Sequence, residues 1–100
     1  MEYSESLKKN RDFQLVYKTG TSYANKYLVM YVRENQLEKN RIGISVSKKV
    51  GNSVVRHRLC RLVRESYRLH ENLFRRGLDI VVVARVSAKE RTFREIESAF

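Results

Sequence analysis

The sequence predicts a single small α+β domain in which helices pack against a sheet. Apolar and polar residues alternate in two stretches, 23–34 and 41–47, which is typical of half-buried strands. Apolar residues recur every three or four positions in 11–20 and 53–74, which is typical of amphipathic helices. The chain has 100 residues, of which 42% are hydrophobic, so one thin core is expected. We therefore treat residues 1–100 as one domain with the order α-β-β-α-β-α.

The first helix is expected to begin at an Asn10 N-cap and to end at Gly20. Three of its apolar residues, Phe13, Val16 and Tyr17, have the spacing that places them on one face. This face is the one that the helix should turn toward the rest of the protein.

The two alternating stretches are expected to form neighbouring strands. Their core-facing residues are Leu28, Met30, Val32, Ile42, Ile44 and Val46. Tyr31 is then left on the opposite face of the sheet. Only the polar turn 35–40 separates the stretches, so the pattern predicts an antiparallel hairpin.

The second helix is expected to run from about Ser53 to about Phe74, with Asn52 as its N-cap. Its apolar stripe comprises Val55, Leu59, Leu62, Leu69 and Leu73. Its opposite face carries His57, Arg61, Arg64 and Arg68, with Arg58 at the flank. The helix should therefore bury one face and present guanidinium groups on the other.

The last part of the chain predicts one more strand and one more helix. The segment DIVVVAR, after Gly77, is apolar on both faces and indicates an interior strand. Thr92 and Glu95 form a capping-box pattern that predicts a final helix. This C-terminal helix would be short, because the sequence ends at Phe100.

Charge is the strongest signal in the composition. Lys and Arg number 21 against 11 Asp and Glu, which gives a net charge of +10. An excess of this size opposes folding by self-repulsion and indicates a polyanionic partner. No apolar run reaches the roughly 18 residues of a membrane span, and the N-terminus lacks the apolar core of a secretory signal. We expect a cytoplasmic protein that binds no membrane.

The sequence gives little support to catalysis by the protein. His57 and Cys60 lie three positions apart on the basic helix, which most simply reflects chance on its surface. The carboxylates are scattered without a metal-ligand pattern, and one cysteine excludes a cysteine-based zinc cluster. We therefore expect neither catalytic residues nor a metal site in the protein.

The basic helix is instead suited to phosphate, because a guanidinium group donates hydrogen bonds in pairs and stays charged. The residues expected to contact phosphate are Lys48, Lys49, Asn52, Arg56, Arg58, Arg61, Arg64, Arg68 and Arg85. Asn52 belongs to this set through the backbone N–H groups of the helix start. The alternative is a solvated face balanced by acids, but only Glu65 and Glu71 are near in sequence.

Three aromatic residues need a separate explanation. Phe13 and Tyr17 lie on the first helix, and Tyr31 lies on the strand face away from the main core. They would suit a groove for single-stranded nucleic acid, whose bases stack on aromatic rings. Packing in a second small core explains them equally well, and the two explanations are compatible.

Three blocks of the chain resemble the bacterial ribonuclease P protein component. The most specific, SVSKKVGNSVVRHRLCRLVRESYR, joins a Ser-x-Ser-Lys-Lys strand end, a Gly-Asn turn and an Arg-His-Arg helix. NRDFQLVYKTGTSYANKYLVMYV precedes it and DIVVVAR follows it. The resemblance implies an α-β-β-β-α-β-α sandwich like ribosomal protein S5 domain 2. Its β-α-β crossover would be left-handed, against the usual rule.

The resemblance also implies the function. The chain would be the protein subunit of ribonuclease P, an endonuclease in which a catalytic RNA hydrolyses the 5′ leader from precursor tRNA. One protein would bind each ribonuclease P RNA, and Mg²⁺ would be bound mainly by the RNA. Phe13, Tyr17 and Tyr31 would line the cleft that holds the leader. The residues facing the catalytic RNA would include Lys48, Lys49, Arg56, His57, Arg58, Arg61 and Arg64.

Two positions depart from the family's pattern. His57 stands where Asn is common, and Cys60 stands where a basic residue is usual. The alternatives are a free-standing RNA- or DNA-binding module, such as a ribosomal protein, and an independent protein nuclease. The three aromatic residues distinguish the ribonuclease P protein from a reader of duplex DNA, because a reader of duplex DNA does not need them.

Overall fold

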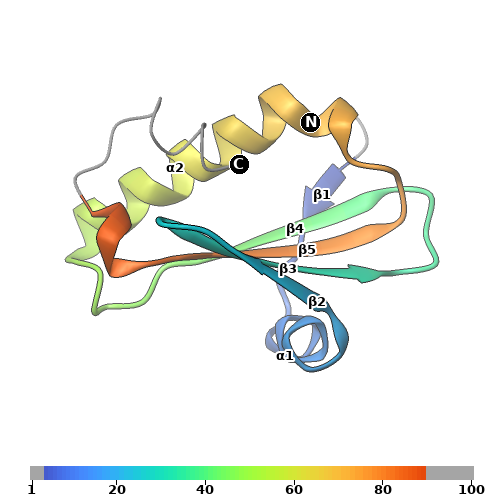
Figure 1. Cartoon of the computed structure of the whole chain (residues 1–100), viewed down its shortest axis with the longest axis horizontal. Helices are drawn as coiled ribbons and strands as arrows, with labels where there is room; N and C mark the ends of the chain where they lie inside the picture. Colours follow the sequence, from blue (N-terminus) through green and yellow to red (C-terminus); the bar gives the residue numbers. More distant parts are fainter. Residues whose placement is uncertain (1–3, 90–100) are drawn as a thin grey trace.

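The computed structural model describes residues 4–89, which form a five-stranded sheet with a helix on each face (Figure 1). The strands are β1 (Ser4–Ser6), β2 (Thr21–Ala24), β3 (Leu28–Glu34), β4 (Asn40–Ser45) and β5 (Leu78–Ala84). The helices are α1 (Asn10–Thr19) and α2 (Ser53–His70), with 3₁₀ turns at Glu71–Leu73 and Val86–Ala88. The predicted α+β class is confirmed. The helix predicted from Thr92 lies outside the described residues.

Strand β5 occupies the centre of the sheet, whose order is β1-β4-β5-β3-β2. It pairs in parallel with β4 and antiparallel with β3. The predicted hairpin between β3 and β4 is therefore wrong, because β5 lies between these strands. A strand that is apolar on both faces buries more surface at the centre of a sheet than at its edge. The left hand of the β4-α2-β5 crossover stays a prediction.

The alternating stretch 23–34 contains two strands rather than one. The side chain of Asn25 accepts hydrogen bonds from the N–H groups of Tyr27 and Leu28 at 3.1 and 2.9 Å, and this turn separates β2 from β3. Alternation alone missed the turn, whereas the family resemblance implied the third strand. The short polar strand β1, which pairs in parallel with β4, was not predicted from either source.

The sheet separates two hydrophobic clusters. The larger lies between the sheet and α2, and its buried residues are Leu28, Ile42, Val50, Leu59, Val63, Tyr67, Leu78, Ile80, Val82, Ala84 and Ala88. The smaller lies on the α1 face and contains Leu7, Val16 and Val81, with Phe13, Tyr17, Tyr31 and Val83 packed against it. The predicted faces of β3 are confirmed, since Met30 and Val32 pack on the larger cluster and Tyr31 on the smaller.

The ends of the helices follow the predicted capping residues only in part. Asn52 caps α2 as predicted, and its side chain accepts a hydrogen bond from the Val55 N–H at 3.0 Å. The N-cap of α1 is Lys9 rather than Asn10, and its side chain makes no capping hydrogen bond. Gly20 ends α1 as predicted.

The predicted apolar stripe of α2 is right in its first half and wrong in its second. Leu59 is buried, but Leu69 and Leu73 are 49% and 80% exposed. Val63 and Tyr67 are buried in their place, and the helix ends at His70 instead of Phe74. The apolar pattern did not reveal this face because the polar residue Ser66 is buried on it. The Ser66 hydroxyl donates a hydrogen bond to the Leu62 carbonyl at 2.8 Å.

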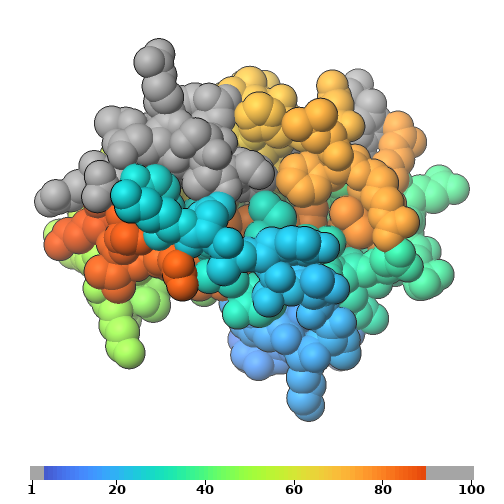
Figure 2. Space-filling view, in the orientation of Figure 1, coloured from blue at the N-terminus to red at the C-terminus, as the bar shows by residue number. Residues whose placement is uncertain are grey.

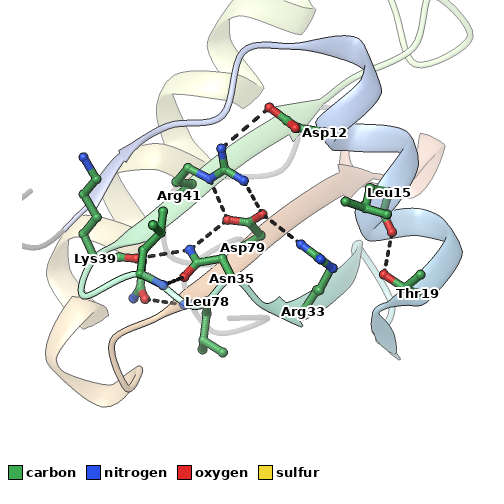
Figure 3. Close-up of polar contacts among 11 residues, drawn as sticks. Asp12, Leu15, Thr19, Arg33, Asn35, Lys39, Arg41, Leu78 and Asp79 are labelled. Atoms are coloured by element: carbon green, nitrogen blue, oxygen red, sulfur yellow. Dashed lines mark hydrogen bonds and ion pairs between the residues drawn. The ribbon is translucent and has the colours of Figure 1, made fainter.

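A buried carboxylate joins the three central strands (Figure 3). Asp79 of β5 accepts hydrogen bonds from Arg41 Nε and Nη2 of β4, at 2.8 and 2.7 Å, and from Asn35 Nδ2 at 2.9 Å. Arg33 of β3 lies 3.7 Å from the same carboxylate, and Arg41 also lies 3.6 Å from Asp12 of α1. Burial alone raises the pKa of Asp79, but the hydrogen bonds from Arg41 and Asn35 outweigh it and lower the pKa below its ordinary value.

Replacing Asp79 with Asn should lower the free energy of unfolding by about 3 kcal/mol at neutral pH, because Arg41 and Arg33 lose a buried partner. Since the pKa of Asp79 is lowered by folding, its contribution is complete above about pH 4 and is lost as the pH falls through the folded-state value. Urea unfolding between pH 7 and pH 3 should show the two proteins converging in acid.

Glu34→Gln is the matched control for this substitution. Glu34 pairs with Arg75 at the surface, where the two side chains are 62% and 68% exposed. Exposed pairs add little stability, so this variant should unfold as the wild type does. An Asp79→Asn protein as stable at pH 7 as the Glu34→Gln protein would mean that the Asp79 network does not hold the sheet together.

Candidate nucleic-acid interface

Three aromatic side chains that are distant in sequence meet on the α1 face of the sheet. The ring centroid of Tyr17 lies 6.5 Å from that of Phe13 and 5.0 Å from that of Tyr31, edge to face in the second pair. Phe13 reaches over Gly43 of β4, where an added Cβ atom would lie 2.4 Å from its ring. The missing side chain at Gly43 therefore lets Phe13 lie against the sheet.

A groove of about 410 Å³ runs beside this cluster. Its lining comprises Lys8, Asn10, Phe13, Gln14, Tyr17, Ile44 and Ser45. Phe13 and Tyr17 thus offer ring surface to a ligand. Tyr31 packs against Tyr17 and is not one of the described residues that line the groove. The aromatic set is thus part of a small core and also borders a groove, which is compatible with both interpretations of the sequence.

The polar residues of the groove were not anticipated from the sequence. Lys8 follows the unpredicted strand β1, and Asn10 and Gln14 lie on α1 beside the aromatic rings. The available signal was the helical spacing, because Asn10, Gln14 and Tyr17 are three and four positions apart. Groups that can hydrogen-bond therefore accompany the stacking surface along the helix.

The outer face of α2 is basic, as predicted. His57, Arg61, Arg64 and Arg68 are exposed, and Arg56 and Arg58 are partly buried beside them. The Nε atom of Arg56 is buried and has no hydrogen-bond partner among residues 4–89. The helix therefore presents a row of cationic side chains to the solvent.

The two glutamates of this region do not balance the row. Glu65 accepts hydrogen bonds from Arg68, including one from Nε at 3.1 Å, and this pairing lowers the pKa of Glu65 and raises that of Arg68. Glu71 is buried and accepts a hydrogen bond from the Ser4 hydroxyl at 2.5 Å. Among the described residues, Arg61 and Arg64 have no carboxylate partner.

Two lysines extend the basic surface to the edge of the sheet. Lys48 and Lys49 are exposed in the turn that leads from β4 to α2. Arg85 follows β5 at the same edge, because the end of β4 pairs with Val83. The Arg85 guanidinium donates to the Asn25 carbonyl at 2.7 Å, so it is held against the β2–β3 turn.

Helix α1, which contributes to the groove lining, and the lysine turn project on the same side of the molecule (Figure 2). Figure 2 shows α1, in blue, and the segment between β4 and α2, in yellow-green, projecting on one side with a recess between them. Ser45 connects the two features, since it lines the groove and ends β4 just before the turn. The groove and the lysines therefore lie on adjoining parts of the surface.

The environment of Cys60 does not suit a nucleophile. Burial raises the pKa of its thiol, and the neighbouring charges of Arg64 and Arg56 do not overcome this effect. A thiol with a raised pKa is a weak nucleophile at neutral pH. Residues 4–89 contain no cluster of three or more His, Cys, Asp or Glu that could hold a metal ion.

Within the described part of the chain, no helix combines the length and the apolarity needed to cross a bilayer.

Known proteins are similar to this chain in sequence and in fold. The family model for ribonuclease P matches residues 1–100. The ribonuclease P protein component of Lachnoclostridium phytofermentans is 64% identical over 96 residues, which cover 96% of this chain and 83% of that protein. Its counterpart in Alkaliphilus metalliredigens is 57% identical over 99 residues, which cover 99% and 89%. The RNase P protein of Staphylococcus aureus superposes with a TM-score of 0.87 at 42% identity, covering 94% of this chain and 86% of that one.

Proposed function

Because the chain belongs to the bacterial ribonuclease P protein family, we propose that it binds two RNA segments at once. As a member, it is the protein component of a ribonucleoprotein endonuclease that processes tRNA. Residues 1–100 act as one RNA-binding domain. The α2 surface binds the ribonuclease P RNA, and the groove beside Phe13 and Tyr17 binds the 5′ leader of precursor tRNA.

The observation that carries this proposal is the position of the aromatic groove beside the lysine turn. Exposed rings stack with unpaired bases of the leader, and the neighbouring lysines bind phosphates of the catalytic RNA, so the two RNA segments are held side by side. The residues that contact the catalytic RNA are Lys48, Lys49, Asn52, Arg56, His57, Arg58, Arg61, Arg64, Arg68 and Arg85. Tyr31 contributes by supporting Tyr17.

The protein assists a reaction whose catalytic groups belong to the RNA. Its cationic side chains reduce the repulsion between the phosphates of the catalytic RNA and those of the precursor. Mg²⁺, bound mainly by the RNA, supplies charge stabilisation and an activated water for hydrolysis. The protein raises the affinity for the precursor by holding the leader, and one protein per RNA suffices for these contacts.

A free-standing RNA- or DNA-binding module is the alternative function. A reader of duplex DNA places a helix in the major groove and needs no stacking surface for unpaired bases. The partly exposed rings of Phe13 and Tyr17 favour a single-stranded ligand instead.

Reconstitution tests the proposal directly. The protein should restore cleavage at the mature 5′ end when it is added to a bacterial ribonuclease P RNA and precursor tRNA at low Mg²⁺. The reason is that bound cationic side chains replace part of the screening that Mg²⁺ otherwise provides. Gel analysis of the products, with RNA alone and protein alone as controls, measures the effect.

Either of two outcomes would contradict the proposal. Binding without stimulation would favour the free-standing module, and cleavage by the protein alone would favour a protein nuclease. The proposal requires stimulation of the RNA and no cleavage without it.

Replacing Tyr17 with Ala should weaken the binding of leader-bearing precursor to the reconstituted complex by about tenfold, since a lost base–aromatic stack costs about 1–3 kcal/mol. The binding of mature tRNA, which lacks the leader, should not change. Equilibrium binding of both RNAs measures the difference.

Tyr17→Phe keeps the ring and should retain affinity. Tyr23→Ala is a second control, because Tyr23 lies on β2 outside the groove and is 61% exposed. Equal losses for precursor and mature tRNA would remove Tyr17 from the leader site.

Arg64 and Arg68 offer a matched pair on the same face of α2. Arg64→Ala should lower the slope of log affinity against log salt for ribonuclease P RNA by up to about 1, because one phosphate contact is lost. Arg68→Ala should change the slope less, since Glu65 already holds the Arg68 guanidinium. Titrations at several salt concentrations measure both slopes. An unchanged slope for Arg64→Ala would place that residue outside the interface.

A further inference from the structure

We infer that the leader path continues beyond the aromatic groove into a second, polar depression at the start of α1. This depression has a volume of about 440 Å³ and is lined by Glu5, Ser6, Leu7, Lys8, Lys9, Arg11, Asp12 and Arg41. Lys8 also lines the aromatic groove, so the two depressions adjoin. This inference rests on the proposed binding of the leader.

The acidic residues of the polar depression are already paired. Glu5 accepts a hydrogen bond from Lys39 Nζ at 3.0 Å. Asp12 lies 3.6 Å from Arg41, whose remaining hydrogen bonds go to buried Asp79. The acids therefore do not neutralise the other cations of the lining.

Three exposed cations remain in and beside this depression. Lys8, Lys9 and Arg11 have no ion pair with any described residue. None of the described residues that line the depression is aromatic, whereas Phe13 and Tyr17 line the groove next to it. The groove is thus suited to bases and the polar depression to phosphates. An RNA leader that leaves the groove past Lys8 then contacts Lys9 and Arg11.

The length of α1 sets the number of nucleotides that the groove can hold. Its lining spans α1 from Asn10 to Tyr17, which is about 10 Å at the helical rise per residue. A stacked strand advances about 3.4 Å per nucleotide, so the groove takes about three nucleotides. We take the leader to enter the groove at the end away from Lys8, so that only a longer leader reaches Lys9 and Arg11. These two residues should therefore affect the binding of long leaders alone.

A series of precursors with leaders of 2 to about 12 nucleotides tests this inference in the reconstituted complex. Wild-type affinity should rise in two steps, as the leader first fills the groove and then reaches the polar depression. The double variant Lys9→Ala, Arg11→Ala should keep the first step and lose the second. For the longest leaders its salt slope should fall by about 1.4, since each lost contact to a single strand lowers the slope by about 0.7.

The variant should fold normally, because the Lys9 side chain makes no capping bond and cations at a helix start are not stabilising. The charge-preserving variant Lys9→Arg, Arg11→Lys should keep both steps. A wild-type affinity that stops rising once the groove is filled would overturn the inference, as would equal losses by the alanine variant on all leaders. Failure of the first step in the wild type would instead overturn the proposed leader site, and the inference with it.

Discussion

Strand β5 is buried on both faces, and this two-sided burial determines how the rest of the chain is arranged. A central strand with Val81 facing one way and Ile80 and Val82 the other needs a helix over each face. The chain supplies α1 on one side and α2 on the other (Figure 1). Asp79 then fixes the neighbouring strands, because Arg41 and Arg33 reach it from β4 and β3. The backbone elements of both proposed RNA surfaces depend on this one strand.

The two faces of the sheet are covered unequally, and the candidate interface follows from this difference. Helix α2 has 18 residues, buries Leu59, Val63 and Tyr67, and leaves only its outer side for a ligand. Helix α1 has 10 residues and buries only Val16 fully. Its aromatic rings therefore remain half covered beside the sheet. A short helix on a wide sheet leaves a groove, and the groove lining reaches Ser45, the last residue of β4 before the segment that leads to α2.

The sequence predicted the elements whose pattern is local and missed those that depend on distant partners. The Asn52 cap, the basic face of α2 and the interior strand β5 each follow from residues within one element. The hairpin prediction failed because the insertion of β5 between β3 and β4 requires a strand more than thirty residues away. In the sequence, Asp79 does not stand out from the other carboxylates, because only the sheet places Arg41 beside it. The groove itself was missed for the same reason, since Ile44 and Ser45 lie beside α1 only in the fold.

The net charge of +10 is distributed so that the fold and a polyanion use different cations. Four cations pair with carboxylates inside the sheet or at its surface: Arg33, Arg41, Lys39 and Arg75. Arg61, Arg64, Lys48 and Lys49 have no carboxylate partner among the described residues, and they lie on α2 or at its start. Their mutual repulsion disfavours the free protein, and a bound RNA removes it. The cations that the internal ion pairs leave unpaired lower the stability of the free protein and also bind the RNA in the proposed complex. RNA binding and folding stability are therefore coupled through these side chains.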